Sequence, residues 1–251
     1  MKNIFKISLL FFFLIISCQS DNDINDSPYP YLNNVGYSAY DILSNNIFTD
    51  IIIEVLYVDE YRPSDEALNN FKSLIEARTY KNIIQINTRL IDISIEESYT
   101  LDAVINIEDN NRSYYSKANR LAIFVLFLNG SSSKDEENSV ILGMAYRNTS
   151  FVIFEETIRL LSDSVNEPNS MVLEATVIEH EFGHLLGLVD VGSPMISDHE
   201  DMENNAHCIS EDCLMYYEIE SVDRTRNFNF EAQIPKFDSF CLADLKANGG
   251  K

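Results

Sequence analysis

The chain has 251 residues, of which 45% are hydrophobic, and it contains 15 Phe and 13 Tyr. This is enough apolar material for one sizeable core, or for two small lobes that share a cleft. The formal net charge of −22 excludes a nucleic-acid-binding surface, because no basic stripe is available to neutralise phosphates.

The first residues, 1–17, have the pattern of a bacterial lipoprotein signal peptide. Two lysines precede an apolar run, 7–16, which as a helix would rise only about 15 Å, half of the roughly 30 Å that a membrane span needs. Leu14 and Ser17, followed by Cys18, resemble a lipobox, in which Cys18 becomes the lipidated first residue. The alternative is cleavage by the ordinary signal peptidase with loss of Cys18. The lipobox predicts an outer-membrane lipoprotein, attached through Cys18 and facing the cell surface or the periplasm.

The rest of the chain is divided into two parts. Residues 18–48 are interpreted as the lipidated cysteine and an acidic tether, because they are polar and lack an apolar period. Residues 49–251 are interpreted as one folded domain, since no linker rich in Pro, Gly or Ser interrupts them.

Strands and helices alternate over the first half of this domain. Runs of β-branched and apolar residues predict strands at 50–61, 82–95, 120–130, 140–147 and 150–156. Amphipathic or capped segments predict helices at 62–79, with a cap near Ser64, and at 100–111. This order predicts an α/β or α+β fold, in which a mixed twisted sheet is followed by a mainly helical half.

The apolar segment from Met171 to Leu188 is predicted to be a buried helix, and it carries His180, Glu181 and His184. Residues four apart lie on one helix face, so the two imidazoles project toward one point. This H-E-x-x-H pattern is typical of Zn²⁺ metalloproteases, in which the glutamate acts as general base on a zinc-bound water. The alternative is two core histidines beside a capped glutamate.

The segment "HEFGHLLGLVD" resembles the metzincin signature, and "CLMYY" offers Met215 for the methionine turn of that family. The resemblance implies a two-lobed zincin fold with an active-site helix. It also implies a small C-terminal lobe with the Met-turn and a helix near 236–246. The implied function is a zinc-dependent endopeptidase that hydrolyses extracellular proteins or peptides. The edge strand of the upper lobe, expected at 140–147, would pair with extended substrate.

The resemblance leaves the third zinc ligand open. Snapalysins place an aspartate there, which corresponds to Asp190. Archaemetzincins place a histidine followed by cysteine, which corresponds to His207 in "HCISEDCLM", although this chain inserts 191–206 before that element. His199 is a third, weaker candidate. Tyr217 stands two residues after Met215, where related families carry a tyrosine that can stabilise the oxyanion.

Apart from Cys18, the chain has three cysteines, Cys208, Cys213 and Cys241. Archaemetzincins build a second, structural zinc site in this region. Either Cys241 forms a disulfide with one of the other two, or the three thiols and Asp244 form a Cys₃Asp zinc site.

We expect the chain to be a monomer. A function of another class is a surface lipoprotein that binds a protein or glycan and whose zinc site is purely structural. Glu181 argues against it, because a structural site gains nothing from a carboxylate beside the metal.

Overall fold

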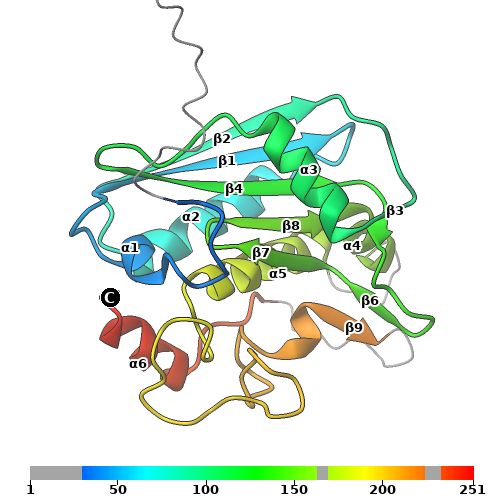
Figure 1. Ribbon diagram of the computed structural model, residues 1–251. Helices are drawn as coiled ribbons and strands as arrows, with labels where there is room; N and C mark the ends of the chain where they lie inside the picture. The colour runs from blue at the N-terminus through cyan, green and yellow to red at the C-terminus, as the bar shows by residue number, and fades with distance from the viewer. Residues whose placement is uncertain (1–29, 163–168, 224–232) are drawn as a thin grey trace, which may run out of the picture.

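The computed structural model describes residues 30–162, 169–223 and 233–251. The predicted signal peptide and Cys18 lie outside these residues. Figure 1 shows a twisted sheet with helices on both faces, above a smaller lobe that contains α6 (Ser239–Ala247) and β9 (Ser221–Asp223). Among the described residues, no helix has the length and apolarity that a membrane span requires.

The main sheet has five strands in the order β2-β1-β4-β8-β7. The first four run parallel, and β7 closes one edge antiparallel to β8. Their bounds are β1 Asp50–Val58, β2 Ile83–Ile91, β4 Arg120–Leu128, β7 Gly143–Arg147 and β8 Ser150–Phe154. The predicted strand at 140–147 is therefore two strands, since β6 (Ser139–Ile141) leaves the sheet to pair with β9.

Alternate residues of the buried strands face two different cores. Ile123 and Val125 of β4 pack on one face, together with α2 (Asp65–Arg78) and α5 (Ser170–Leu185). Phe124 and Leu126 pack on the other face, beneath α3 (Leu101–Asn111). Strands that are buried on both faces carry continuous apolar runs, which explains the unbroken apolar sequence of β4. Figure 1 shows α3 in front of the sheet and α2 behind it.

The helices begin where the sequence places caps. Ser64 precedes α2, and its hydroxyl accepts a hydrogen bond from the Ala67 N–H, as predicted. Thr100 caps α3 in the same way.

The short helix α4 (Glu155–Ser162) follows β8 directly and contacts α5. Two-residue strands β3 (Ser98–Tyr99) and β5 (Ser131–Ser132) pair beside the main sheet.

The folded domain begins before the predicted boundary at residue 49. Residues 39–43 form the short helix α1 (Ala39–Leu43), and Ile42, Leu43 and Phe48 are fully buried in the core below the sheet. The Asn148 amide donates hydrogen bonds to the Pro30 carbonyl at 2.9 Å and to the Ser38 hydroxyl. Residues 30–48 are thus part of the domain rather than of a tether, because their apolar side chains complete its core.

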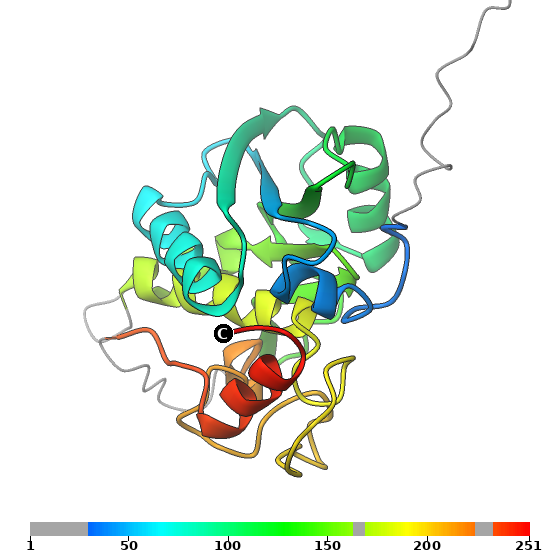
Figure 2. The same cartoon turned by 90° about the vertical axis from the view of Figure 1, so that its left-hand side faces the viewer.

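The lower lobe is mostly irregular chain that is held to the upper lobe at both ends. It leaves α5 at Gly187 and returns through the 3₁₀ turn η2 (Tyr217–Ile219), β9 and α6. The last residue, Lys251, donates its backbone N–H to the Arg78 carbonyl at the end of α2 at 3.0 Å. Figure 2 shows α6 and the C-terminus below the cyan helix α2.

Candidate metal centre

Helix α5 is the element that positions the candidate site. Asn169 caps its first turn by accepting the Met171 N–H, and residues 172–185 are buried. The helix ends at Leu185, and Gly187 then adopts a φ of +72°. A Cβ at Gly187 would lie 2.5 Å from the Ser193 backbone nitrogen, so only glycine allows the chain to turn this sharply. The turn sends the following loop below the helix toward His207.

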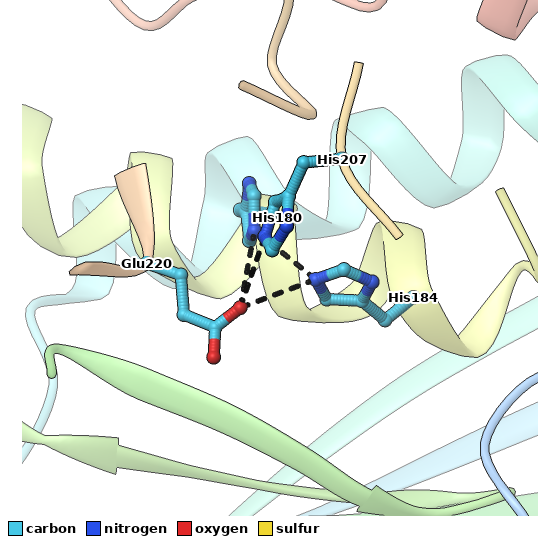
Figure 3. A group of neighbouring side chains, drawn as sticks. All are labelled: His180, His184, His207 and Glu220. Carbon is cyan, nitrogen blue, oxygen red and sulfur yellow. Dashed lines mark hydrogen bonds and ion pairs between the residues drawn. The ribbon is translucent and has the colours of Figure 1, made fainter. Parts of the chain in front are cut away.

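Three histidines meet at one point under α5 (Figure 3). The Nε2 atoms of His180 and His184, one turn apart, are 3.1 Å from each other. The His207 ring comes from the loop below, and its centroid lies 5.3 Å from that of His180 and 5.1 Å from that of His184. The structure thus brings His207 to the two helix histidines. This is the arrangement expected if His207, rather than Asp190 or His199, is the third ligand.

Hydrogen bonds to the far side of two rings fix which nitrogen faces the centre. His180 Nδ1 lies 2.7 Å from the Leu214 carbonyl, and His207 Nδ1 lies 3.0 Å from the Asn205 carbonyl. A carbonyl can only accept, so each Nδ1 carries a proton, and in a neutral ring Nε2 then presents the lone pair. Burial lowers the pKa of His180 to about 4, which keeps this ring neutral.

This donor set fits a zinc ion. The Nε2 lone pair of His180 lies 3.1 Å from His184 Nε2, so a cation between the two atoms could be bound by both rings. Tetrahedral Zn²⁺ with bonds of about 2.0–2.1 Å holds its ligand atoms about 3.3 Å apart. The separation of the two imidazoles is therefore the one that a bound zinc ion requires.

Glu181 lies beside this point. Both of its carboxylate oxygens are buried, no side chain of the described residues is hydrogen-bonded to them, and the backbone of Ala145 in β7 is the polar group that approaches them. Burial, and then the charge of Glu220, raise its pKa well above the usual range of a carboxylic acid, which the Ala145 backbone only partly offsets. A buried carboxylate with so little compensation is costly unless it acts on a ligand. It packs against Gly143 of the edge strand β7, where a Cβ would lie 2.7 Å from Glu181 Oε1.

Met215 supports α5 from below. It is fully buried, and a Cβ at Gly183, between the two helix histidines, would lie 2.3 Å from its sulfur. The Met215 carbonyl accepts the Cys208 N–H at 2.8 Å, which ties this turn to the residue after His207. Its side chain therefore packs under the site, as an adaptable thioether does in a core.

Two other candidates for the third ligand lie elsewhere. Asp190 is exposed, with a φ of +61°, and is not among the described groups of side chains that could hold a metal. Its distance from Gly187 suggested that it could reach the metal, but the chain coils away immediately after the helix. His199 belongs to a second cluster, described below.

Tyr217 is placed near the centre, but its hydroxyl is engaged. The hydroxyl donates to Glu218 Oε1 at 3.1 Å, and the residue lines a surface pocket of about 440 Å³. A role at an oxyanion would require this hydrogen bond to break.

Sequence reasoning missed Glu220, whose carboxylate joins the three histidines. The ligand atoms of His180, His184, His207 and Glu220 all lie within 4.8 Å of one another. The residue follows η2, five positions after Met215. No spacing rule distinguishes it from the neighbouring glutamate, Glu218, so only the tertiary arrangement identifies it.

The three cysteines form a second cluster and are free thiols in this structure. Cys213 Sγ and Cys241 Sγ are 3.6 Å apart, whereas a disulfide requires about 2.05 Å. The expected bridge is therefore absent among these residues. Cys208, Cys241, Asp238 and His199 place their ligand atoms within 4.8 Å of one another.

Asp244, the expected fourth ligand of that cluster, has a different partner. Its carboxylate lies 2.8 Å from His199 Nε2, which leaves His199 Nδ1 directed at Cys208 Sγ, 3.4 Å away. A carboxylate that orients a histidine toward a metal is a recurring arrangement in zinc sites. Asp238 takes the place near the thiols, because it also caps α6 by accepting the Cys241 N–H.

Comparison with known proteins relates this chain to others by structure. No protein-family model matches the sequence, and no curated protein matches it. The crystal structure of archaemetzincin from Methanopyrus kandleri is similar, with a TM-score of 0.54 and 14% identity over 80% of this chain and 96% of that chain. A zinc-dependent peptidase from Methanocorpusculum labreanum is similar with a TM-score of 0.48 and 13% identity, over 76% of this chain and 99% of its own. The likeness to the first structure confirms the predicted zincin fold class.

Proposed function

We propose that this chain is a zinc-dependent endopeptidase that hydrolyses peptide bonds of extracellular proteins or peptides. The observation that carries the proposal is the convergence of His180, His184 and His207 beside the buried carboxylate of Glu181. A purely structural zinc site has no use for such a carboxylate, and burying it with no side-chain partner is costly.

The protein side of the reaction follows from the positions of these residues. His180, His184 and His207 would hold Zn²⁺, which supplies Lewis-acid chemistry and makes water acidic enough to lose a proton near neutral pH. Glu181 would take the proton from the attacking water and deliver it to the leaving amine. Burial raises the pKa of this carboxyl, which favours the state that holds the proton between the two transfers.

The edge strand β7 offers a place for the substrate backbone. It pairs with β8 on one side only, and Gly143 at its start is next to Glu181. An extended peptide added antiparallel to this edge would pass the carboxylate, a form of β-augmentation. The substrate backbone would then be held by strand hydrogen bonds rather than by a pocket specific for one side chain.

The thiol cluster supports a second, structural zinc ion. Cys208, Cys241 and His199 converge with Asp238, and Cys213 Sγ lies 3.6 Å from Cys241 Sγ. With Cys213 in place of Asp238 the ligands would be Cys₃His, which is a common set for closed zinc sites. The backbone N–H groups of Met215 and Asp238 approach Cys213 Sγ at 3.4 and 3.5 Å, and such hydrogen bonds stabilise a thiolate. This ion would pin α6 and the loop of His207 under the active helix.

The lipobox at Cys18 supports a place at the membrane. Attachment through a lipid on Cys18 would leave the domain in the periplasm or on the cell surface as an outer-membrane lipoprotein. Labelling the expressing cells with a radioactive fatty acid, with Cys18→Ala as control, tests this; an unlabelled parent chain contradicts it.

The test of the proposed function compares peptide cleavage by the purified chain with cleavage by Glu181→Gln. Glu179→Gln is the matched control, because it removes the same charge from the same helix two residues away. We expect loss of at least about 10²-fold in kcat/KM for Glu181→Gln only, within the range for a general base. Equal turnover in all three chains would refute the mechanism. Zinc binding without cleavage by the parent chain would favour the binding-protein alternative.

A further inference from the structure

The carboxylate of Glu220 occupies the fourth corner of the histidine site (Figure 3). Its Oε2 atom lies 3.1 Å from His207 Nε2, 3.5 Å from His184 Nε2 and 3.9 Å from His180 Nε2. These separations bracket the roughly 3.3 Å between ligand atoms around tetrahedral Zn²⁺. The two helix histidines are 3.1 Å apart, and all four ligand atoms lie within 4.8 Å of one another, so they surround one point.

The contact between Glu220 and the imidazoles calls for a cation. His180 and His207 hold their ring protons on Nδ1, against the Leu214 and Asn205 carbonyls. In a neutral ring with its proton on Nδ1 the Nε2 atom accepts, and a carboxylate oxygen also only accepts. With His184, these groups bring four ligand atoms within 4.8 Å of one another, and a divalent cation among them would bind all four, so we count Glu220 as part of the metal site.

The backbone holds Glu220 firmly in this place. The Leu142 N–H donates to its carbonyl at 2.8 Å, immediately before β7 begins. The next residue, Ser221, starts β9, which is paired with β6. Only the side chain is free to change its position, and 23% of its surface is accessible to solvent.

We infer that Glu220 is a fourth protein ligand that closes the coordination position which catalytic zinc sites keep open. The inference rests on the proposed function, since it concerns the same zinc ion. Structural zinc sites have four protein ligands, and catalytic ones have three and an open position. The resting enzyme is accordingly in a closed, latent form, and the Glu220 side chain must rotate toward solvent before a peptide carbonyl can reach the site.

The experiment uses cobalt as a spectroscopic substitute for zinc in the purified full chain. The spectrum of a His180→Ala variant is subtracted, so that cobalt held by the thiol cluster does not contribute. The chain is compared with Glu220→Ala and with Glu211→Ala. Glu211→Ala is the matched control, because Glu211 is an exposed residue of the same loop and its loss changes the charge equally. Each chain is titrated with cobalt and then with sodium acetate.

We expect Glu220→Ala to weaken cobalt binding at the histidines by at least about tenfold, and to change its visible absorption. Acetate should then restore the parent spectrum in Glu220→Ala, since it replaces the lost carboxylate, and should leave the parent chain and Glu211→Ala unchanged. Equal affinity and spectra in parent and Glu220→Ala, with no effect of acetate, would overturn the inference and leave the proposed function intact. If cobalt binding to the parent and to His180→Ala is identical, the histidines hold no metal and both proposals fail.

Discussion

Gly143→Ala tests whether the position of Glu181 is set by the edge strand. The added Cβ would lie 2.7 Å from Glu181 Oε1, 2.8 Å from its Cγ and 2.9 Å from Val177 Cγ1. Contacts between such atoms normally begin at about 3.5 Å, so the carboxylate must retreat by roughly 0.7 Å. The helix cannot move with it, because α5 is buried between the sheet and the lower lobe.

A displacement of about 1 Å in a catalytic group typically costs on the order of 10²-fold in rate. We therefore expect kcat/KM of Gly143→Ala to fall by about 30- to 100-fold. Its zinc content should not change, because Gly143 does not contact the histidines. Overpacking costs about 1–3 kcal/mol, which the gain of alanine over glycine in a strand, about 0.5–1 kcal/mol, partly offsets.

The assay measures cleavage of a quenched fluorescent peptide, with the free energy of unfolding measured in urea. Gly250→Ala is the steric control, because its Cβ would also meet three atoms at 2.9 Å, but far from the site. It should lower stability and leave turnover unchanged. If Gly143→Ala cleaves peptide within threefold of the parent rate, Glu181 does not act from the place described.

Three further predictions concern packing, metal content and pH. Gly183→Ala would place a Cβ 2.3 Å from Met215 Sδ. The cost of overpacking, about 1–3 kcal/mol, should exceed the helix-propensity gain of about 1 kcal/mol, so the urea midpoint of unfolding should fall. An unchanged midpoint would contradict this packing. Cys213→Ser should reduce zinc, measured by mass spectrometry, from two ions per chain to one, whereas two ions in both chains would disprove the second site. Burial, and then the charge of Glu174, raise the pKa of Glu155 to about 8 from 4.5, so the folded chain keeps a proton that the unfolded chain has lost. The free energy of unfolding should therefore fall as pH rises from about 4.5 to 8, and Glu155→Gln should flatten that slope in urea titrations at several pH values.

Local periodicity was sufficient to predict the elements of the upper lobe. The continuous apolar run of β4 and the capped amphipathic pattern of α2 each indicate one structure, and both are confirmed. The run at 140–147 was predicted as one strand but is two. The break at Leu142 depends on a hydrogen bond to Glu220, a residue almost eighty positions away in the sequence. Nothing local to the run indicates that partner.

The site was predictable only where its residues are close in sequence. His180, Glu181 and His184 share one helix, so spacing alone places them together. Glu220 and His199 come from irregular chain, whose path is set by tertiary contacts such as the hydrogen bond between His199 and Asp244 of α6. The early start of the domain had a local signal, because Ile42, Leu43 and Phe48 are apolar residues within the segment assigned to the tether.

One peptide bond, between His207 and Cys208, joins the two clusters of the lower lobe. The first residue faces the active helix, and the second faces the thiols, with its N–H held by the Met215 carbonyl. Oxidation that draws the sulfur atoms together would therefore shift the adjoining imidazole. The geometry of the candidate metal centre is in this way linked to the state of the thiol cluster.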